Sequence, residues 1–238
     1  MREGLDQSRA CSLPSIYVAA HELKAPLVLM RQLVLELRQA GVSSAQTQTV
    51  ERLILTVERS LRLVDQLTKT SRLEDGLFET EPLLAETVCK VVADELQPSA
   101  RQYGQAISVR VSRRAGMVVG HRSLLVALLI NLCDNALQHN SLGEKITISA
   151  KSSDKGVVFA VRDNGPPMAR RQFEAMRTQA GHKALSIASN RPRSSGLGLW
   201  IASKFAETMQ GELQFTRHRA GGVTVSVLMP YSSQMSLL

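Results

Sequence analysis

Residues 21–44 read HELKAPLVLMRQLVLELRQAGVSS, and this stretch decides the architecture of the first third of the chain. Apolar side chains recur there every three or four residues, on one face of an amphipathic helix: Leu23, Leu27, Met30, Val34 and Leu37. The spacing predicts a helix over about 14–40, ended by Gly41 and a short polar turn. Pro26 lies inside the pattern and removes one backbone hydrogen bond, so we expect a bend just after His21.

A second apolar pattern predicts another helix over about 46–74. Its stripe again repeats at spacings of three and four: Val50, Leu53, Val57, Leu61, Val64 and Leu67. Two long helices joined by a short turn form an antiparallel hairpin, and one hairpin cannot cover its own apolar stripe. We therefore expect two copies to pair as a homodimeric four-helix bundle.

The rest of the chain mixes helical and alternating patterns. Gly76 and Pro82 interrupt the helical pattern and mark a domain boundary. We therefore expect a tail (1–13), a helical domain (14–76) and a second domain (77–238). In the second domain we expect helices over about 82–101, 121–139 and 199–209, and a loop over 164–195. Strands are expected at 106–112, 145–152, 156–163, 211–218 and 222–230. The predicted fold class is α+β, a helical hairpin followed by a two-layer α/β sandwich.

Composition excludes several classes of function. The net charge is +8, but Lys and Arg are scattered and not interleaved with aromatic residues, so no nucleic-acid partner is predicted. Cys11, Cys89 and Cys133 show no CxxC spacing, which favours reduced thiols in the cytoplasm. The longest apolar run, LLVALLIN at 124–131, is far shorter than the roughly 20 residues of a membrane helix. We expect a cytoplasmic chain, which could be the soluble part of a larger or membrane-associated protein.

Four short motifs follow one another: HELKAP at 21–26, NLCDNALQHN at 131–140, DNG at 163–165 and SSGLGL at 194–199. In this order they resemble the H, N, G1 and G2 boxes of the sensor histidine kinases of two-component systems. The resemblance covers nearly the whole chain. It implies a dimerisation and phosphotransfer hairpin followed by an ATP-binding domain of the fold shared by gyrase, the 90 kDa heat-shock chaperone, histidine kinases and mismatch-repair ATPases.

The first motif carries His21 beside Glu22. A neutral imidazole is a competent nucleophile near pH 7, and a neighbouring carboxylate can orient the ring or accept its proton. The competing interpretation is an exposed histidine on a helix surface. The resemblance implies that Glu22 acts as the base and that His21 receives the γ-phosphoryl group of ATP.

The second motif places Asn131 and Asn135 one helical turn apart. Amide oxygens suit Mg²⁺, although two asparagines could equally make hydrogen bonds within a core helix. The resemblance implies that Asn135 is the chief Mg²⁺ ligand, that Asn131 assists, and that His139 lies near the nucleotide. Gln138 stands where many relatives have a phosphate-contacting Lys or Arg.

The third motif ends an apolar strand with Asp163 and Gly165. A buried carboxylate can accept a hydrogen bond from an exocyclic amine, and a glycine lets a flat base approach the backbone. A tight Asn-Gly turn is the competing interpretation. The resemblance implies that Asp163 reads the adenine amino group. Pro167 stands where the family usually has a second glycine.

The fourth motif leads into a helix, where backbone N–H groups can surround phosphates. An ordinary loop-to-helix turn is the alternative. The resemblance assigns nucleotide contacts to Gly196, Leu197, Gly198 and Leu199. The family commonly has a further glycine in place of Ser194. The preceding segment is predicted to be a mobile ATP lid whose basic residues contact phosphates: Lys183, Arg191 and Arg193.

The reaction follows from one position in the second motif. Relatives that hydrolyse ATP carry a water-activating glutamate where this chain has Asn131, and an amide cannot deprotonate water. We therefore predict a protein histidine kinase that uses ATP and Mg²⁺ to phosphorylate His21 and then transfers the phosphoryl group to an aspartate of a response regulator. Relatives that also dephosphorylate their partner often have Thr or Asn at the position of Ala25, so weak phosphatase activity is predicted.

Two alternatives stay open at this point. The departures at Gln138, Pro167 and Ser194 allow a degraded kinase that binds ATP or acts as a scaffolding dimer without phosphotransfer. A non-enzymatic dimerisation module would explain the helical hairpin, but it would leave the four ordered motifs as coincidence.

Overall fold

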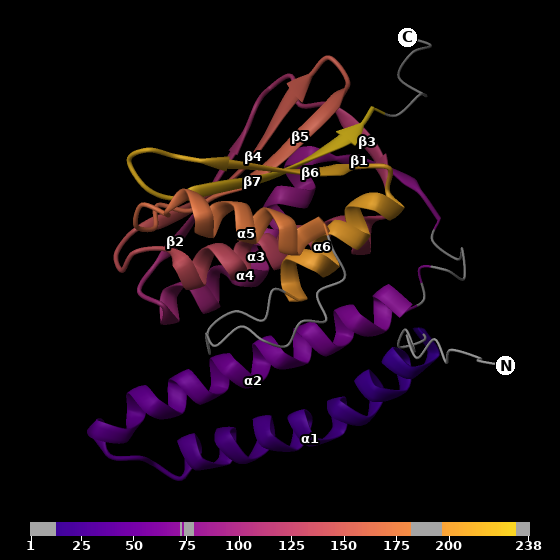
Figure 1. Cartoon of the computed structure of the whole chain (residues 1–238). Helices are drawn as coiled ribbons and strands as arrows, with labels where there is room; N and C mark the ends of the chain where they lie inside the picture. Colours follow the sequence, from indigo (N-terminus) through magenta and orange to yellow (C-terminus); the bar gives the residue numbers. More distant parts are fainter. Residues whose placement is uncertain (1–12, 72, 74–78, 182–196, 232–238) are drawn as a thin grey trace, which may run out of the picture. The chain divides into compact units, whose positions relative to one another are not determined.

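The computed structural model describes residues 13–71, 73, 79–181 and 197–231 (Figure 1). Contacts within the chain divide it into two compact units, Met1–Leu77 and Phe78–Leu238. Each unit is considered by itself below.

The first unit is an antiparallel hairpin of α1 (Leu13–Gln39) and α2 (Ser44–Ser71), which confirms the two helices expected from the apolar spacing. Gly41 ends α1 with φ of +89°, a left-handed conformation that favours glycine. Ser43 opens α2 with a capping arrangement, because Gln46 Oε1 accepts hydrogen bonds from both the backbone N–H (3.3 Å) and the hydroxyl (2.9 Å) of Ser43. The turn between the helices is therefore fixed at both sides.

Ion pairs join the two helices at a regular interval. Each pair lies seven residues along both helices from the one before it: Lys24–Asp65 at 2.8 Å, Arg31–Glu58 at 3.7 Å and Arg38–Glu51 at 3.7 Å. Because a seven-residue step returns to nearly the same face of a helix, one side of the hairpin carries all three pairs.

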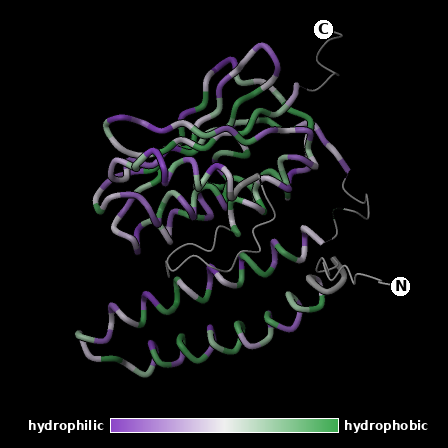
Figure 2. Tube along the Cα trace, viewed as in Figure 1, coloured by the Kyte–Doolittle hydropathy of each residue, from purple (hydrophilic) through white to green (hydrophobic). Residues whose placement is uncertain are grey.

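The apolar stripe expected on α1 divides into two rows. Leu27 and Val34 are half-buried. Leu23, Met30 and Leu37, again seven residues apart, expose 53%, 50% and 48% of their surface, and Leu33 exposes 54%. Figure 2 shows how much of α1 is hydrophobic. A single copy of the hairpin thus leaves an apolar row on α1 uncovered, whereas a typical soluble helix buries such a row.

The second unit is a sheet covered on one side by helices (Figure 1). Its strands are β2 (Ala106–Val111), β4 (Lys145–Ser153), β5 (Gly156–Arg162), β6 (Glu212–Arg217) and β7 (Val223–Pro230), in the order β2-β4-β5-β7-β6. β2 and β4 are parallel and the other neighbours are antiparallel. The helices are α3 (Ala85–Gln102), α4 (Arg122–His139), α5 (Arg170–Gly181) and α6 (Leu197–Thr208).

Alternation along the strands builds the core of this unit. On β4 and β5 every second side chain is buried, including Ile146, Ile148 and Phe159 at 0% exposure, and these residues face the helices. α4 is buried along most of its length, as the run at 124–131 suggested. The α+β class and the two-layer sandwich are therefore confirmed.

Three elements were not expected from the sequence. β1 (Glu81–Leu84) and β3 (Met117–Gly120) form a separate antiparallel pair, and each has only four residues, too few for alternation to be recognised. The prediction of a loop over 164–195 is wrong for Arg170–Gly181, which is α5. Phe173 is the one buried side chain described on α5, so the segment has almost no apolar pattern. None of the helices that the structure describes is long and apolar enough to cross a bilayer.

Candidate functional site

Asp163 follows β5 directly and is held by the backbone on both sides. It is 8% exposed. Its Oδ1 accepts a hydrogen bond from Gly165 N (2.9 Å) and its Oδ2 accepts one from Val223 N (3.2 Å). Its own N–H donates to Val223 O (3.1 Å), which anchors it to the first residue of β7. Since each carboxylate oxygen can accept a second hydrogen bond, the Asp163 carboxylate can still accept hydrogen bonds from a ligand.

Gly165 is required by packing against α4. A Cβ there would lie 2.3 Å from the carbonyl oxygen of His139 and 3.0 Å from Asp163 Oδ1. The sequence had suggested that this glycine admits a flat base. In the structure the space of its missing side chain is taken by the last residue of α4 instead. Gly222 is similarly constrained, with a Cβ position 2.1 Å from the carbonyl oxygen of Asp163.

A chain of amide hydrogen bonds ties the end of α4 to the loop after β5. Asn140 follows α4 as its C-cap residue, and its Oδ1 accepts from Asn164 N at 2.8 Å. Its Nδ2 donates to Gln105 Oε1 at 3.2 Å, and Gln105 Nε2 donates to Leu137 O at 2.9 Å. Sequence reasoning gave none of these residues a role. The only available indication was an asparagine at a helix end, which is common at caps.

Asn131 and the start of α6 lie together. α4 and α6 pack against each other, and a Cβ on Gly198 would lie 3.7 Å from Asn131 Oδ1. Asn131 is 4% exposed, and its Nδ2 has no hydrogen-bond partner among the residues that the structure describes. A buried amide without a partner is costly, and a ligand that accepts a hydrogen bond would offset that cost. The second and fourth motifs, far apart in sequence, thus meet here.

The other residues of the second motif line the same helix. Asn135 is half-buried one turn after Asn131, and His139 is exposed. Gln138 folds back onto its own helix, because its Nε2 donates to Asp134 O at 2.8 Å. Its Oε1 is buried and has no partner in the described ranges. Gln138 therefore supplies no charge at this position of α4.

The glycine-rich motif is described from Leu197 onward. Leu197, Gly198 and Leu199 form the first turn of α6, so the helix begins two residues earlier than expected. N–H groups in the first turn of a helix have no intrahelical acceptor, and a phosphate at the start of a helix can accept hydrogen bonds from such groups. Gly196 and Ser194, together with the three basic lid residues at 183, 191 and 193, lie outside the described residues.

His21 and Glu22 are both exposed on α1. The ring of His21 lies 6.4 Å from that of Tyr17, centroid to centroid, at an interplanar angle of 31°. α1 continues without interruption through Pro26. Since Pro26 has no N–H, the carbonyl of Glu22 loses its helical donor directly beside His21. The expected bend stays a prediction.

The donor set available for a metal is made of amides. No cluster of three or more His, Cys, Asp or Glu residues suited to a metal occurs in the described ranges. Asn131 and Asn135 offer amide oxygens, which fit a Mg²⁺ ion that takes most of its other ligands from phosphate and water.

Cys89 on α3 and Cys133 on α4 are both fully buried and free. Burial raises the pKa of the Cys89 thiol to about 12. Burial, with smaller contributions from Asp134 and Cys89, raises the pKa of Cys133 well above its ordinary value. Both thiols are therefore structural rather than reactive, which fits the expectation of reduced cysteines. Cys11 lies outside the described residues.

Known proteins resemble this chain in sequence and in fold. Residues 120–233 match the family described as histidine kinase-, DNA gyrase B- and HSP90-like ATPase. Among curated proteins, the chain is 30% identical over 226 residues to the sensor protein SphS of Synechococcus elongatus, covering 91% of the chain and 54% of SphS. It is 28% identical over 214 residues to the sensor protein CutS of Streptomyces coelicolor, covering 89% of the chain and 51% of CutS. The chain thus spans about half the length of the curated relatives it matches.

Solved structures agree on the fold. The full-length ShkA structure in complex with AMPPNP superposes with a TM-score of 0.65 at 22% identity, covering 93% of this chain and 46% of ShkA. The Acinetobacter baumannii histidine kinase AdeS gives 0.55 at 17% identity, covering 89% of this chain and 98% of that one. Residues 120–233 therefore match the histidine kinase-, DNA gyrase B- and HSP90-like ATPase family, and most of the chain is similar in sequence to the sensor proteins SphS and CutS and in fold to the histidine kinase AdeS.

Proposed function

We propose that this chain uses ATP to phosphorylate His21 and then passes the phosphoryl group to an aspartate of a response regulator receiver domain. The observation that carries the proposal is the buried amide of Asn131, whose Nδ2 has no partner within the described part of the chain and which lies against the first turn of α6. This amide can donate a hydrogen bond to a phosphate oxygen. Because position 131 carries an amide and not a carboxylate, it cannot activate a water molecule. Phosphoryl transfer to a side chain then requires only positioning and charge stabilisation.

On the nucleotide side, each residue has a chemically defined role. Asp163, fixed by two backbone amides, accepts a hydrogen bond from the exocyclic amine of adenine. The backbone N–H groups of Gly198 and Leu199, in the first turn of α6, and the Nδ2 of Asn131 donate to phosphate oxygens. Asn135, assisted by Asn131, supplies amide oxygens to Mg²⁺, an ion that neutralises developing negative charge on the phosphates.

On the acceptor side, a ring nitrogen of His21 attacks the γ-phosphorus. The N–P bond forms as the bond to the β–γ bridging oxygen breaks, and ADP leaves. Glu22, adjacent in sequence and equally exposed, accepts or orients the proton on the other ring nitrogen. Because the carbonyl of Glu22 has no helical donor at Pro26, this part of α1 has more conformational freedom than a regular helix would have.

The test is transfer of label from [γ-³²P]ATP with Mg²⁺. Wild type is expected to gain acid-labile, base-stable label, and His21→Gln none, while nucleotide affinity of His21→Gln stays unchanged because His21 belongs to the helical unit. Asn135→Ala is expected to lose both label and Mg²⁺-dependent nucleotide binding. Undiminished labelling of His21→Gln would refute the assignment of the acceptor.

One observation favours a second candidate, a nucleotide-binding scaffold without catalysis. Gln138 is turned back onto α4 and offers no charge to phosphates. If wild type binds ATP but carries no label and labels no receiver domain, the scaffold is the better description. Gln138→Lys is then expected to restore labelling if the missing cation is the cause.

We also propose that the functional unit is a homodimer formed through α1. The uncovered apolar row supports this, because such a row costs stability in water and a second hairpin would bury it. Leu33→Asp is expected to shift sedimentation from dimer to monomer. Gln39→Asp, at another exposed position on α1 that is polar, is the control and should leave the dimer intact.

Weak dephosphorylation of the partner is proposed from Ala25. This side chain is exposed and has neither donor nor acceptor to orient a water molecule. The phosphorylated receiver domain is expected to lose phosphate only slowly in the presence of wild type, and faster with Ala25→Thr. Rapid dephosphorylation by both wild type and His21→Gln would contradict this proposal.

A further inference from the structure

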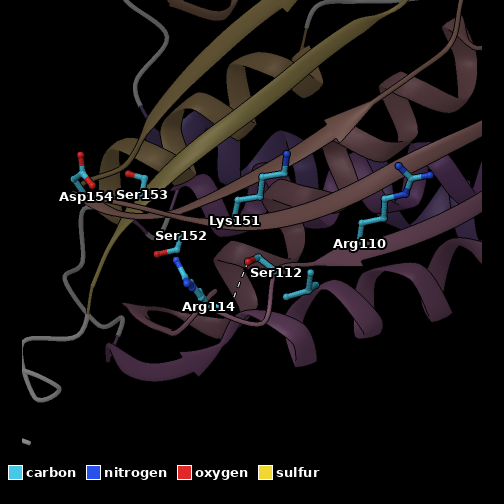
Figure 3. A pocket seen from close by; sticks show the side chains of 8 residues that line it. Arg110, Ser112, Arg114, Lys151, Ser152, Ser153 and Asp154 are labelled. Atoms are coloured by element: carbon cyan, nitrogen blue, oxygen red, sulfur yellow. Dashed lines mark hydrogen bonds between the residues drawn. The ribbon is translucent and has the colours of Figure 1, made fainter.

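A groove with a volume of about 600 Å³ lies at the edge of the sheet, where β2 and β4 end (Figure 3). Its lining includes three cationic side chains, several serines and one carboxylate: Arg110, Arg114, Lys151, Ser112, Ser153 and Asp154. A volume of this size is ordinary for a small-molecule site.

The groove is separate from the candidate nucleotide site. β5 begins at Gly156, which pairs with Ser153 across the β4–β5 turn, and it ends at Arg162 next to Asp163. Because β5 has seven residues and a strand rises about 3.3 Å per residue, Asp163 lies roughly 20 Å from that turn. The two sites therefore occupy opposite ends of the same sheet.

Two of the three cations of the groove, Arg110 and Lys151, lie on neighbouring strands. Arg110 pairs in register with Ser149, and Lys151 lies two residues further along β4, so both side chains project from the same face as diagonal neighbours (Figure 3). Arg110, Arg114 and Lys151 make no side-chain hydrogen bond or ion pair within the described part of the chain. Like charges at this spacing repel each other, and a bound anion would relieve that repulsion.

The serines of the groove add hydrogen-bond donors, which, like the cations, can bind an anion. Ser112 Oγ accepts a hydrogen bond from Arg114 N and Ser153 Oγ accepts one from Lys155 N, both at 3.3 Å. Each hydroxyl hydrogen is therefore still available to a ligand. Asp154 is the one carboxylate in the lining, which leaves an excess of positive charge.

We propose that this groove binds a ligand carrying phosphate groups, at a site distinct from that of ATP. Phosphate oxygens accept hydrogen bonds and carry the opposite charge, and guanidinium groups bind them in a bidentate geometry. The concave shape and limited volume favour a phosphate on a small molecule or on a lipid headgroup. The proposal does not depend on phosphotransfer by His21.

The test is a titration of the full chain with inorganic pyrophosphate in the absence of Mg²⁺. Binding is monitored by the NMR chemical shifts of the backbone amides. Shifts are expected at 110–114 and 151–155. Arg110→Gln and Lys151→Gln are each expected to weaken binding about tenfold, as for loss of one charge-assisted contact, whereas Lys151→Arg retains it. All three substitutions are at exposed positions, and unchanged thermal unfolding confirms that the variants are folded.

Arg101→Gln is the matched control, because it removes the same charge from an exposed position on α3 outside the groove. Its affinity for pyrophosphate is expected to stay within twofold of wild type. Equal weakening by Arg101→Gln and Lys151→Gln would overturn the proposal, since diffuse surface charge would then explain binding. Shifts confined to 131–139 and 163–165 would overturn it as well.

Vesicles distinguish the two sources of phosphate. Binding to phosphatidylglycerol vesicles but not to phosphatidylcholine vesicles, abolished by Lys151→Gln, would assign the groove to an anionic headgroup. Pyrophosphate binding without vesicle binding would assign it to a soluble phosphate compound. If polyglutamate of equal charge displaces pyrophosphate equally well, the groove recognises acidic protein segments and the proposal fails.

Discussion

An alanine substitution should lower stability at Gly165 but not at Gly198. In Gly165→Ala the new Cβ would lie 2.3 Å from His139 O, so α4 or the loop after β5 must move by at least about 0.7 Å to reach a 3.0 Å contact. Overpacking of this kind, together with a disturbed hydrogen bond to Asp163, costs roughly 2–4 kcal/mol. At about 2–4 °C per kcal/mol for a domain of this size, the Tm of the second unit should fall by roughly 5–15 °C.

Gly198→Ala meets no such obstacle. The nearest described atom to its Cβ is Asn131 Oδ1 at 3.7 Å, an ordinary contact, and alanine stabilises a helix by up to about 1 kcal/mol relative to glycine. The Tm should therefore stay the same or rise slightly. The added methyl group, however, stands beside the amide that we assign to Mg²⁺ and phosphate, so ATP affinity should fall about tenfold or more.

Differential scanning calorimetry and ATP titration of both variants test these expectations. Gly165→Ala should lose stability and, as a consequence, affinity, whereas Gly198→Ala should lose affinity alone. If Gly165→Ala melts at the wild-type temperature, close packing against His139 is not the reason for that glycine. If Gly198→Ala binds ATP normally, the first turn of α6 is not in contact with the nucleotide.

Further predictions concern hydrogen bonding and titration. Asn140→Ala should lower the free energy of unfolding by about 2–3 kcal/mol in urea titrations, because it leaves the buried Gln105 Oε1 without a donor. The raised pKa of Cys89, about 12 against an ordinary value of 9.0, means that the folded state retains the thiol proton, so its stability contribution is complete below pH 9 and is lost as pH rises toward 12. Stability of wild type should thus fall more steeply than that of Cys89→Ala between pH 9 and 10.5. In an NMR titration, His218 should show a pKa below 6.5, because burial and then Arg162 disfavour its charged form. Arg162→Gln should raise that pKa.

The sequence was sufficient where apolar spacing was long and regular. α1, α2 and α4 each carry many periods of the helical pattern, and β4, β5 and β7 alternate over seven to nine residues. β1 and β3 pair with each other over four residues, so tertiary contact rather than local pattern determines them. The sequence did not predict α5 for a related reason, since a single buried phenylalanine does not make a periodic apolar pattern.

For the candidate site, the sequence identified residue types but not their arrangement. Nothing local to Asn131 or Gly198 shows that they meet, because the contact depends on the packing of α4 on α6. The reason for Gly165 was likewise hidden, since His139 is distant in sequence. Asn140 was inside a quoted motif, yet its hydrogen bonds to Asn164 and Gln105 exist only once three segments are assembled.

The seven-residue interval between the ion pairs constrains how the two helices of the hairpin could slide along each other. Sliding by a single turn would break all three pairs at once, bringing Lys24 opposite Arg62 in one direction and opposite Lys69 in the other. Sliding by two turns would find new partners, with Lys24 opposite Glu58, but the short connection at Gly41 prevents so large an excursion. Although each exposed pair contributes at most about 1 kcal/mol, their common spacing makes small axial displacements uniformly unfavourable. Motion transmitted along this hairpin should therefore take the form of rotation or bending rather than translation.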